Sequence, residues 1–149
     1  MDLSKNKNTE LDAVMPLIRE QLAAGGTVTF SPRGVSMLPM IRQGKDSVTL
    51  SPVKGRLKKY DLPLYMRDSG QYVLHRIVRV GETYSCIGDN QYLIEPGVRH
   101  DQIIGVVSSF SREGRNVKVT APSYWLYCRL WSLRRSIRLI LKRILRRSA

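Results

Sequence analysis

Short stretches in which apolar and polar residues alternate fill the middle of the chain, from Thr27 to Val119. They are rich in β-branched and aromatic residues, and Gly, Pro, Asp and Asn separate them, which is typical of strands joined by turns. Because residues 68–70 and 80–82 are turn-like and lie between neighbouring strands, we expect consecutive hairpins there. The strands are expected at residues 27–31, 47–51, 63–67, 72–80, 83–87, 103–111 and 117–119.

Helical periodicity replaces this alternation near the N-terminus. A helix is expected to begin at Thr9 and to end at Gly25-Gly26, because glycine favours helix ends. Pro16 lies inside this segment and is expected to kink the helix, since proline removes a backbone hydrogen bond. The expected apolar stripe consists of Leu11, Val14, Ile18 and Leu22.

A second helical pattern follows Pro122, where apolar residues recur every three or four positions among arginines. The chain is therefore predicted to be mainly β, with a short N-terminal helix in residues 1–25, a β body in residues 26–120 and a basic amphipathic helix in residues 121–149. The expected apolar face of the last helix contains Trp125, Leu126, Leu130, Trp131, Leu133, Ile137, Leu141 and Ile144.

The positive charge is concentrated in this last segment. The formal net charge is +13, and residues 121–149 hold eight of the 25 Lys and Arg residues but none of the 12 Asp and Glu residues. Such a helix suits an anionic membrane surface, with its tryptophans at headgroup depth and its arginines on phosphates. The alternative is a helix packed on its own domain or on a partner. No module that reads nucleic-acid bases is recognisable, so a specific nucleic acid is not an expected partner.

The chain has no run of 18 apolar residues and no apolar stretch at its N-terminus, so neither a membrane span nor an export signal is expected. Together with the basic helix, this predicts a cytoplasmic protein that associates peripherally with the membrane. Cys86 and Cys128 lie far apart and lack the spacing of metal ligands. We therefore expect two free thiols, no metal site and no cofactor.

Ser36 lies in a segment that suits a nucleophile, Gly34-Val35-Ser36-Met37-Leu38-Pro39. Gly34 permits tight backbone geometry, and Pro39 stiffens the exit. A serine nucleophile also needs a base within hydrogen-bond reach and a group that orients this base. Taken alone, such a segment is more often an ordinary turn.

His75 is the candidate base. It lies in an apolar strand, where alternation places it on the same face as Val73 and Ile77. A lone histidine in this setting is more often a core residue bonded to a backbone carbonyl. Two carboxylates further along the chain, Asp89 and Glu95, can approach a histidine, although each also suits a turn or a solvated loop.

Taken together, these segments resemble the superfamily of type I signal peptidases and LexA-type repressors. The segments Ser36-Met37-x-Pro39, His75-Arg76-Ile77 and Gly88-Asp89-Asn90 occur in the family's order, and the resemblance covers residues 26–107. It is nearest to the endoplasmic-reticulum-like branch, in which histidine replaces the lysine base. The resemblance implies a signal-peptidase-like β domain of antiparallel strands and hairpins.

The resemblance also implies a serine endopeptidase. Ser36 would attack a peptide carbonyl, while His75 takes the serine proton and passes it to the leaving amine. Either Asp89 or Glu95 would orient the imidazole: the Gly-Asp-Asn motif slightly favours Asp89, whereas the reticulum branch has its orienting aspartate at the position of Glu95. The substrate would be an extended leader or signal-type polypeptide with small residues near the cut, docked along a β edge.

Signal peptidases commonly carry a serine two positions before the nucleophile, and this chain has Gly34 there, as LexA-type proteins do. The oxyanion hole is therefore expected to consist of backbone N–H groups, including that of Ser36, in the turn formed with Val35 and Met37. The alternative function is a catalytically inactive peptide-binding module of the same fold, tethered to the membrane.

Overall fold

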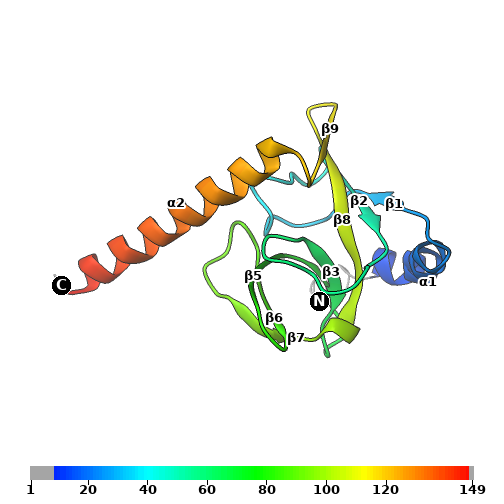
Figure 1. Cartoon of the computed structure of the whole chain (residues 1–149), viewed down its shortest axis with the longest axis horizontal. Coiled ribbons are helices and arrows are strands. Elements are labelled where there is room, and N and C mark those ends of the chain that lie inside the picture. The colour runs from blue at the N-terminus through cyan, green and yellow to red at the C-terminus, as the bar shows by residue number, and fades with distance from the viewer. Residues whose placement is uncertain (1–8, 148–149) are drawn as a thin grey trace, which may run out of the picture.

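The computed structural model describes residues 9–147, and residues 1–8 and 148–149 lie outside the described part. An antiparallel β body carries one helix at each end of the chain (Figure 1). The strands form one six-stranded sheet and one three-stranded sheet. The prediction of a mainly β protein with an N-terminal and a C-terminal helix is therefore confirmed.

The six-stranded sheet has the strand order β1-β2-β8-β3-β4, with β9 paired to β8, and all of its pairs are antiparallel. β1 and β4 are thus the two ends of its main path. Its alternating pattern buries one face against the larger core, where Val48 and Leu50 have no exposed surface. The strands are β1 (Val28–Phe30), β2 (Ser47–Ser51), β3 (Pro63–Met66), β4 (Tyr72–Leu74), β8 (Ile103–Arg112) and β9 (Arg115–Lys118).

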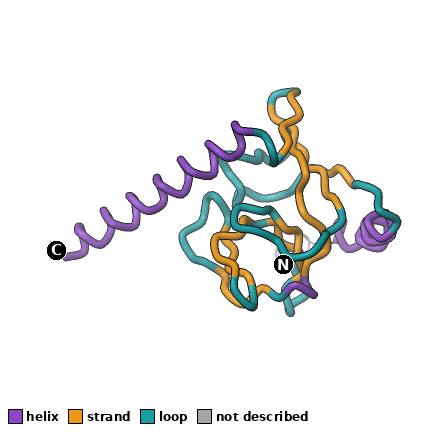
Figure 2. Tube along the Cα trace, viewed as in Figure 1, coloured by secondary structure: helices purple, strands orange, loops and turns teal. Residues whose placement is uncertain are grey.

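The three-stranded sheet contains β5 (Arg76–Val80), β6 (Tyr84–Ile87) and β7 (Glu95–Val98), in that order. A short 3-10 helix, η1 (His100–Gln102), leads from β7 into β8. Both predicted hairpins are present, because β3 pairs with β4 and β5 pairs with β6. Figure 2 shows that the strands of both sheets, together with the long loops that connect them, make up the β body.

Two details of the strand prediction are wrong. The expected strand at residues 72–80 is interrupted at His75, because β4 pairs with β3 in one sheet and β5 pairs with β6 in the other. The chain therefore changes sheets at the candidate base. β7 was not expected, because Pro96 and Gly97 are rare inside strands. It is an edge strand of its sheet, where proline is tolerated.

The N-terminal helix, α1 (Thr9–Ala23), continues through Pro16 and ends as predicted, with Gly25 at a φ of +83°. Its buried stripe differs from the expected one: Met15 is buried in the larger core, whereas Val14 is 43% exposed. The reason is that Val14 faces a groove of the β body rather than the core.

The C-terminal helix, α2 (Pro122–Arg147), packs on the body mainly through its first turns, and its far end projects beyond the body (Figure 1). Tyr124, Cys128 and Trp131 are its buried residues. Further along the helix, Lys142 still lies over the Tyr92 ring, 3.8 Å from its centre. Within residues 9–147, no helix combines the length and the apolar composition that crossing a bilayer requires.

The expected apolar face of α2 is corrected at Trp131. This residue is only 9% exposed, and its indole N–H donates to the carbonyl oxygen of Asp89 at 3.0 Å. Trp131 therefore cannot lie at headgroup depth, since it is bound to its own domain. Trp125 is 57% exposed and stacks on the Arg129 guanidinium.

Candidate active site

Ser36 and His75 line one groove, which has a volume of about 720 Å³. Val14 of α1 contributes an apolar wall. The two ends of the six-stranded sheet also reach the groove, through Phe30 of β1 and Tyr72 of β4. The fold thus brings the predicted nucleophile and the predicted base, 39 residues apart in sequence, to the same hollow.

Residues 34–39 surround the candidate nucleophile and have the geometry that their sequence suggests; we call them the nucleophile turn. Gly34 adopts a φ of +92°, which strongly favours glycine, and its N–H donates to Oε1 of Gln43 at 2.7 Å. Met37 is buried in the larger core, whereas Val35 is exposed. The turn is therefore anchored by Met37 and presents Ser36 at the groove.

A second turn, Gly88-Asp89-Asn90, holds the nucleophile turn from behind. The backbone N–H of Asn90 donates to the Ser36 carbonyl oxygen at 2.8 Å, and Nδ2 of Asn90 donates to the Val35 carbonyl oxygen at 3.2 Å. A Cβ atom on Gly88 would lie 2.6 Å from the Ser36 carbonyl oxygen. Glycine is required here because the two backbones approach so closely. We call residues 88–90 the supporting turn.

His75 is 4% exposed and lies in the sheet-changing break between β4 and β5. Its Nδ1 atom is 3.4 Å from the hydroxyl of Tyr65, which is buried on β3. The same hydroxyl donates to Oε2 of Glu95 at 2.7 Å, and Arg67 binds both carboxylate oxygens of Glu95 at 2.7 and 2.8 Å. His75, Tyr65, Glu95 and Arg67 therefore form a connected polar chain.

This polar chain selects the tautomer of His75. Arg67 lowers the pKa of Glu95, chiefly through its hydrogen bonds, so Glu95 is an anion that only accepts. The single proton of the Tyr65 hydroxyl consequently points to Glu95, and the Tyr65 oxygen accepts from Nδ1–H of His75. The proton is thus on Nδ1, and Nε2 is left with the lone pair that a general base requires.

Burial lowers the pKa of His75 to about 4, and the positive charge of Arg67 acts in the same direction. Glu95 and Asp89 oppose this shift. The imidazole is consequently neutral at pH 7, which is the state that accepts a proton. Tyr65 stays a neutral phenol, because burial and its bond to Glu95 raise its pKa.

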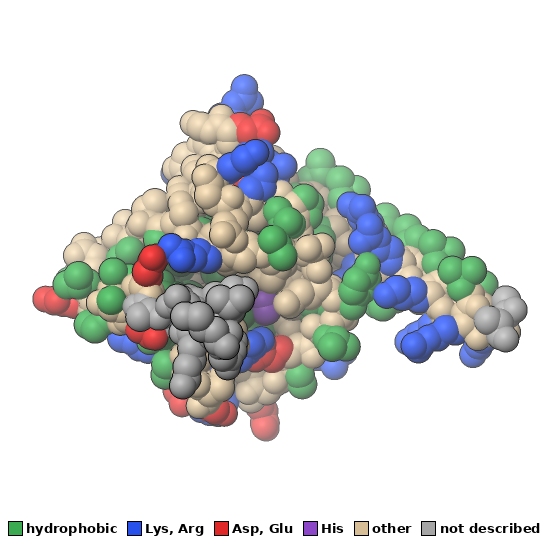
Figure 3. Space-filling view, turned by 180° about the vertical axis from the view of Figure 1, so that it is seen from behind, with side chains coloured by type: hydrophobic (Ala, Val, Ile, Leu, Met, Phe, Trp, Pro, Cys, Tyr) green, Lys and Arg blue, Asp and Glu red, His purple; other side chains and the backbone are tan. Residues whose placement is uncertain are grey.

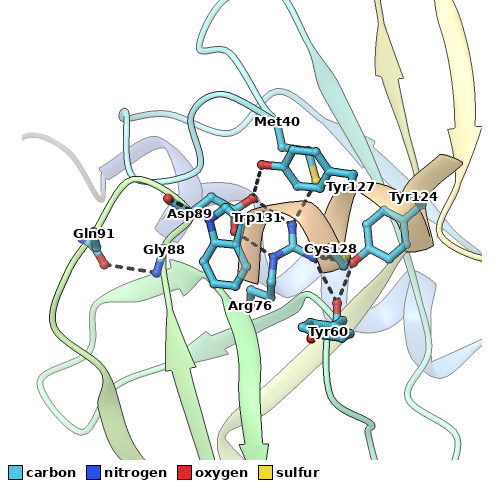
Figure 4. Close-up of polar contacts among 10 residues, drawn as sticks. All are labelled: Met40, Tyr60, Arg76, Gly88, Asp89, Gln91, Tyr124, Tyr127, Cys128 and Trp131. Atoms are coloured by element: carbon cyan, nitrogen blue, oxygen red, sulfur yellow. Dashed lines mark hydrogen bonds and ion pairs between the residues drawn. The ribbon is translucent and has the colours of Figure 1, made fainter. Parts of the chain in front are cut away.

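The Asp89 carboxylate is bonded to Arg76 and Tyr127 rather than to His75 or Tyr65. It accepts two hydrogen bonds from Arg76, at 2.7 and 2.8 Å, and one from the Tyr127 hydroxyl at 2.8 Å (Figure 4). Neither the Arg76 nor the Asp89 side chain has exposed surface. The structure therefore joins Glu95 to His75 through Tyr65, against the slight preference for Asp89 that the Gly-Asp-Asn motif suggested.

Within residues 9–147, no hydrogen bond joins the hydroxyl of Ser36 to His75. Catalytic hydrogen bonds are often long before a substrate binds, and they tighten in the complex. The Gly34 N–H is already bonded to Gln43, so it is not available to an oxyanion. The expected oxyanion donors of this turn are therefore its other backbone N–H groups, including that of Ser36.

Both cysteines are free, as predicted, and the structure places both in buried positions. In the described part of the chain, no cluster of His, Cys, Asp and Glu has the makings of a metal site. Burial raises the pKa of the Cys86 thiol to about 12, so it stays protonated and inert at neutral pH.

Two partners of the candidate base were missed from the sequence, Tyr65 and Arg67. Tyr65 lies on β3 and Arg67 directly follows the end of this strand, and β3 pairs with β4, which leads directly into His75. Side chains two apart share a face of an extended segment, so the Tyr-x-Arg spacing in the strand expected at residues 63–67 was the available signal.

No protein-family model matches the chain, and the search of curated proteins also finds no match.

Proposed function

We propose that this protein is a serine endopeptidase of the signal-peptidase-like type, with Ser36 as nucleophile and His75 as general base. The observation that carries the proposal is the groove in which a turn-borne serine and a buried, neutral histidine lie together. The histidine also has its Nδ1 proton engaged by Tyr65, which leaves Nε2 for the serine. If His75 were only a core residue, there would be no reason for it to line a groove together with a turn-borne serine.

The mechanism follows from these positions. Nε2 of His75 takes the proton of Ser36 as the serine oxygen attacks the peptide carbonyl, and the positive imidazolium is stabilised through Tyr65 by the Glu95 anion. His75 then protonates the leaving amine, which breaks the peptide bond and leaves an acyl group on Ser36. A water molecule, deprotonated by the same nitrogen, releases the acyl group.

The groove suits an extended polypeptide. β4 pairs with β3 alone along the main path of its sheet, so its other edge can accept a peptide strand next to His75. The apolar walls formed by Val14 and Phe30 favour small apolar side chains. We propose a leader or signal-type segment as the substrate, with small residues near the cut.

Cleavage mapping tests the peptidase assignment. A mixture of peptides with varied sequences is incubated with the wild-type protein and with Ser36→Ala, and the products are identified by mass spectrometry. We expect cuts that share small residues next to the broken bond and that are absent with Ser36→Ala. Products that are identical with both proteins would refute the proposal.

The rival function is an inactive peptide-binding module with the same groove. It predicts that peptides bind with equal affinity to the wild-type protein and to Ser36→Ala, and that neither protein cuts them. Isothermal titration with the peptides that survive the cleavage assay separates the two functions.

We further propose that α2 binds an anionic membrane surface from the cytoplasmic side. Leu126, Leu130, Leu133, Ile137 and Leu141 are 48–58% exposed. At about 100° per residue, they lie roughly 180–260° around the helix axis from Tyr124, opposite the buried side chains of Tyr124, Cys128 and Trp131, and so face away from the body. Lys and Arg side chains flank the helix (Figure 3), and α2 contains no acid. Anionic lipid headgroups are the complementary partner.

Vesicle sedimentation tests this surface. Leu133→Ser combined with Ile137→Ser should lower binding to phosphatidylglycerol-containing vesicles by roughly 10-fold or more, because two exposed apolar side chains that would be buried in the lipid are lost. Leu93→Ser is the matched control, since Leu93 is 86% exposed in a loop. Equal binding of both variants, or equal binding to neutral phosphatidylcholine vesicles, would contradict the proposal.

A further inference from the structure

Arg76 is buried between the two candidate catalytic residues and α2. It follows His75 directly in sequence, and its guanidinium binds the Asp89 carboxylate of the supporting turn. It also donates to the Met40 sulfur at 3.1 Å, immediately after the nucleophile turn. One buried cation therefore links the base, the supporting turn and the exit of the nucleophile turn.

The inner face of α2 encloses this cation. Arg76 lies 5.4–5.5 Å from the ring centres of Tyr124, Tyr127 and Trp131. It also donates to the Tyr124 hydroxyl at 2.8 Å and to the Cys128 sulfur at 3.0 Å. Figure 4 shows these side chains gathered around the guanidinium. A buried charge is costly unless it is paired and bonded, so α2 supplies much of what stabilises Arg76.

Two residues of α2 also hold the supporting turn itself. The Tyr127 hydroxyl donates to Oδ2 of Asp89 at 2.8 Å, and the Trp131 indole donates to the Asp89 carbonyl oxygen at 3.0 Å. The next residue, Asn90, is the one that bonds the Ser36 and Val35 carbonyl oxygens. A continuous path of hydrogen bonds thus runs from α2 through residues 89–90 to the nucleophile.

We infer that α2 is a positioning element for the nucleophile, acting through Tyr127 and Trp131 on the supporting turn. This inference rests on the proposed function and adds a second role to the helix beyond membrane contact. Neither side chain touches the groove, so both act through Asp89 and Asn90. Their loss should displace Ser36 without removing any group that contacts a substrate.

The test compares three conservative variants in the full chain, each checked for folding by circular dichroism. Tyr127→Phe removes one hydroxyl, and Trp131→Phe removes the indole N–H. Trp125→Phe is the matched control, because Trp125 lies on the same helix and is exposed. Acylation of Ser36 by a serine-reactive probe is resolved into an affinity and a maximal rate, and amide exchange of Asn90 is measured by NMR.

We expect Tyr127→Phe and Trp131→Phe to lower the maximal acylation rate by roughly 10-fold or more, with probe affinity within about twofold of wild type. Exchange of the Asn90 amide should accelerate in both variants and stay unchanged in Trp125→Phe. Rates and exchange equal to wild type in both variants would overturn the inference, as would a loss confined to probe affinity. If the wild-type protein is not acylated, the proposed function fails, and Asn90 exchange alone decides whether α2 holds the turn.

Discussion

At the scale of single residues, the chemistry of the groove depends on which nitrogen of His75 carries the proton. Tyr65 fixes this proton on Nδ1, because the Tyr65 hydroxyl must give its own proton to Glu95. In a Ser-His-Asp site the carboxylate bonds the histidine directly. Here a phenol stands between the two groups, and the carboxylate is further neutralised by Arg67. The imidazole is therefore oriented but only weakly stabilised as a cation.

The low pKa of His75 predicts an unusual pH profile. Because the imidazole loses its proton at a pKa of about 4, the acylation rate of Ser36 should stay near its maximum from pH 8 down to about pH 5. It should fall to half near pH 4. The rate is measured under pseudo-first-order conditions, and circular dichroism at each pH confirms that the protein is folded. A half-maximal rate near pH 6.5 would contradict this account of the base.

The hydroxyl of Tyr65 can be removed with little change in shape. Tyr65→Phe should lower the acylation rate by roughly 10-fold or more, since the Nδ1 proton loses its acceptor and the tautomer is no longer fixed. Tyr84→Phe is the matched control, because Tyr84 makes a similar contact with His100 at 3.0 Å, outside the groove. Equal acylation rates in the two variants would show that the Tyr65 hydroxyl does not orient His75.

At the scale of elements, the site is made by two turns and a break between strands. Alternation of apolar residues predicted most strands, because each strand buries one face and exposes the other. It did not predict the break at His75, since the residues on both sides of the break are buried and the change of sheet depends on pairing partners distant in sequence. Strand pairing cannot be read from one segment alone.

The same limit applies to the candidate site. Ser36 and His75 were recognisable from their motifs, and Gly34 from the geometry that a tight turn requires. The partner of Asp89 was not, because Asp89 and Arg76 are 13 residues apart and meet only where β5 begins and β6 ends. Likewise, the side of α2 that faces the body depends on contacts that a helical period does not specify.

Because the supporting turn and the nucleophile turn approach so closely, adding one methyl group at Gly88 is predicted to disturb the site. Gly88→Ala should lower Ser36 acylation by roughly 10-fold or more, because the added Cβ would overlap the Ser36 carbonyl oxygen and push the turns apart. Gly81→Ala is the control, since its added Cβ would lie 3.6 Å from the Thr83 carbonyl oxygen, an ordinary contact. Wild-type acylation in folded Gly88→Ala would show that the supporting turn does not position the nucleophile.

At the scale of the whole molecule, both helices are built into the β body. Ile18 and Leu22 of α1, and Tyr124 and Cys128 of α2, belong to the same core cluster as the strands of the larger sheet. The groove is therefore bounded by α1 on one side, while α2 supports the turns behind it. Loosening either helix is expected to affect the site.

Burial of His75 also makes the stability of the whole molecule pH-dependent. The folded pKa is about 4, below the ordinary value of 6.5, so the unfolded state binds the proton more readily and stability falls as pH falls from 6.5 towards 4. The unfolding free energy should drop by about 2 kcal/mol between pH 7.5 and pH 5. Urea titrations at the two pH values measure it. In His75→Gln this drop should disappear, and an equal drop in the variant would assign it to other groups.

The measurement that tests the central claim most directly is covalent labelling of Ser36. The purified protein is treated with a serine-reactive acylating probe, with anionic vesicles present for α2, and its intact mass is determined alongside Ser36→Ala and His75→Ala. An activated serine predicts one adduct on the wild-type protein, none on Ser36→Ala, and labelling slower by roughly 10³-fold or more on His75→Ala. A folded wild-type protein that takes up no probe would contradict the peptidase assignment and favour the peptide-binding module.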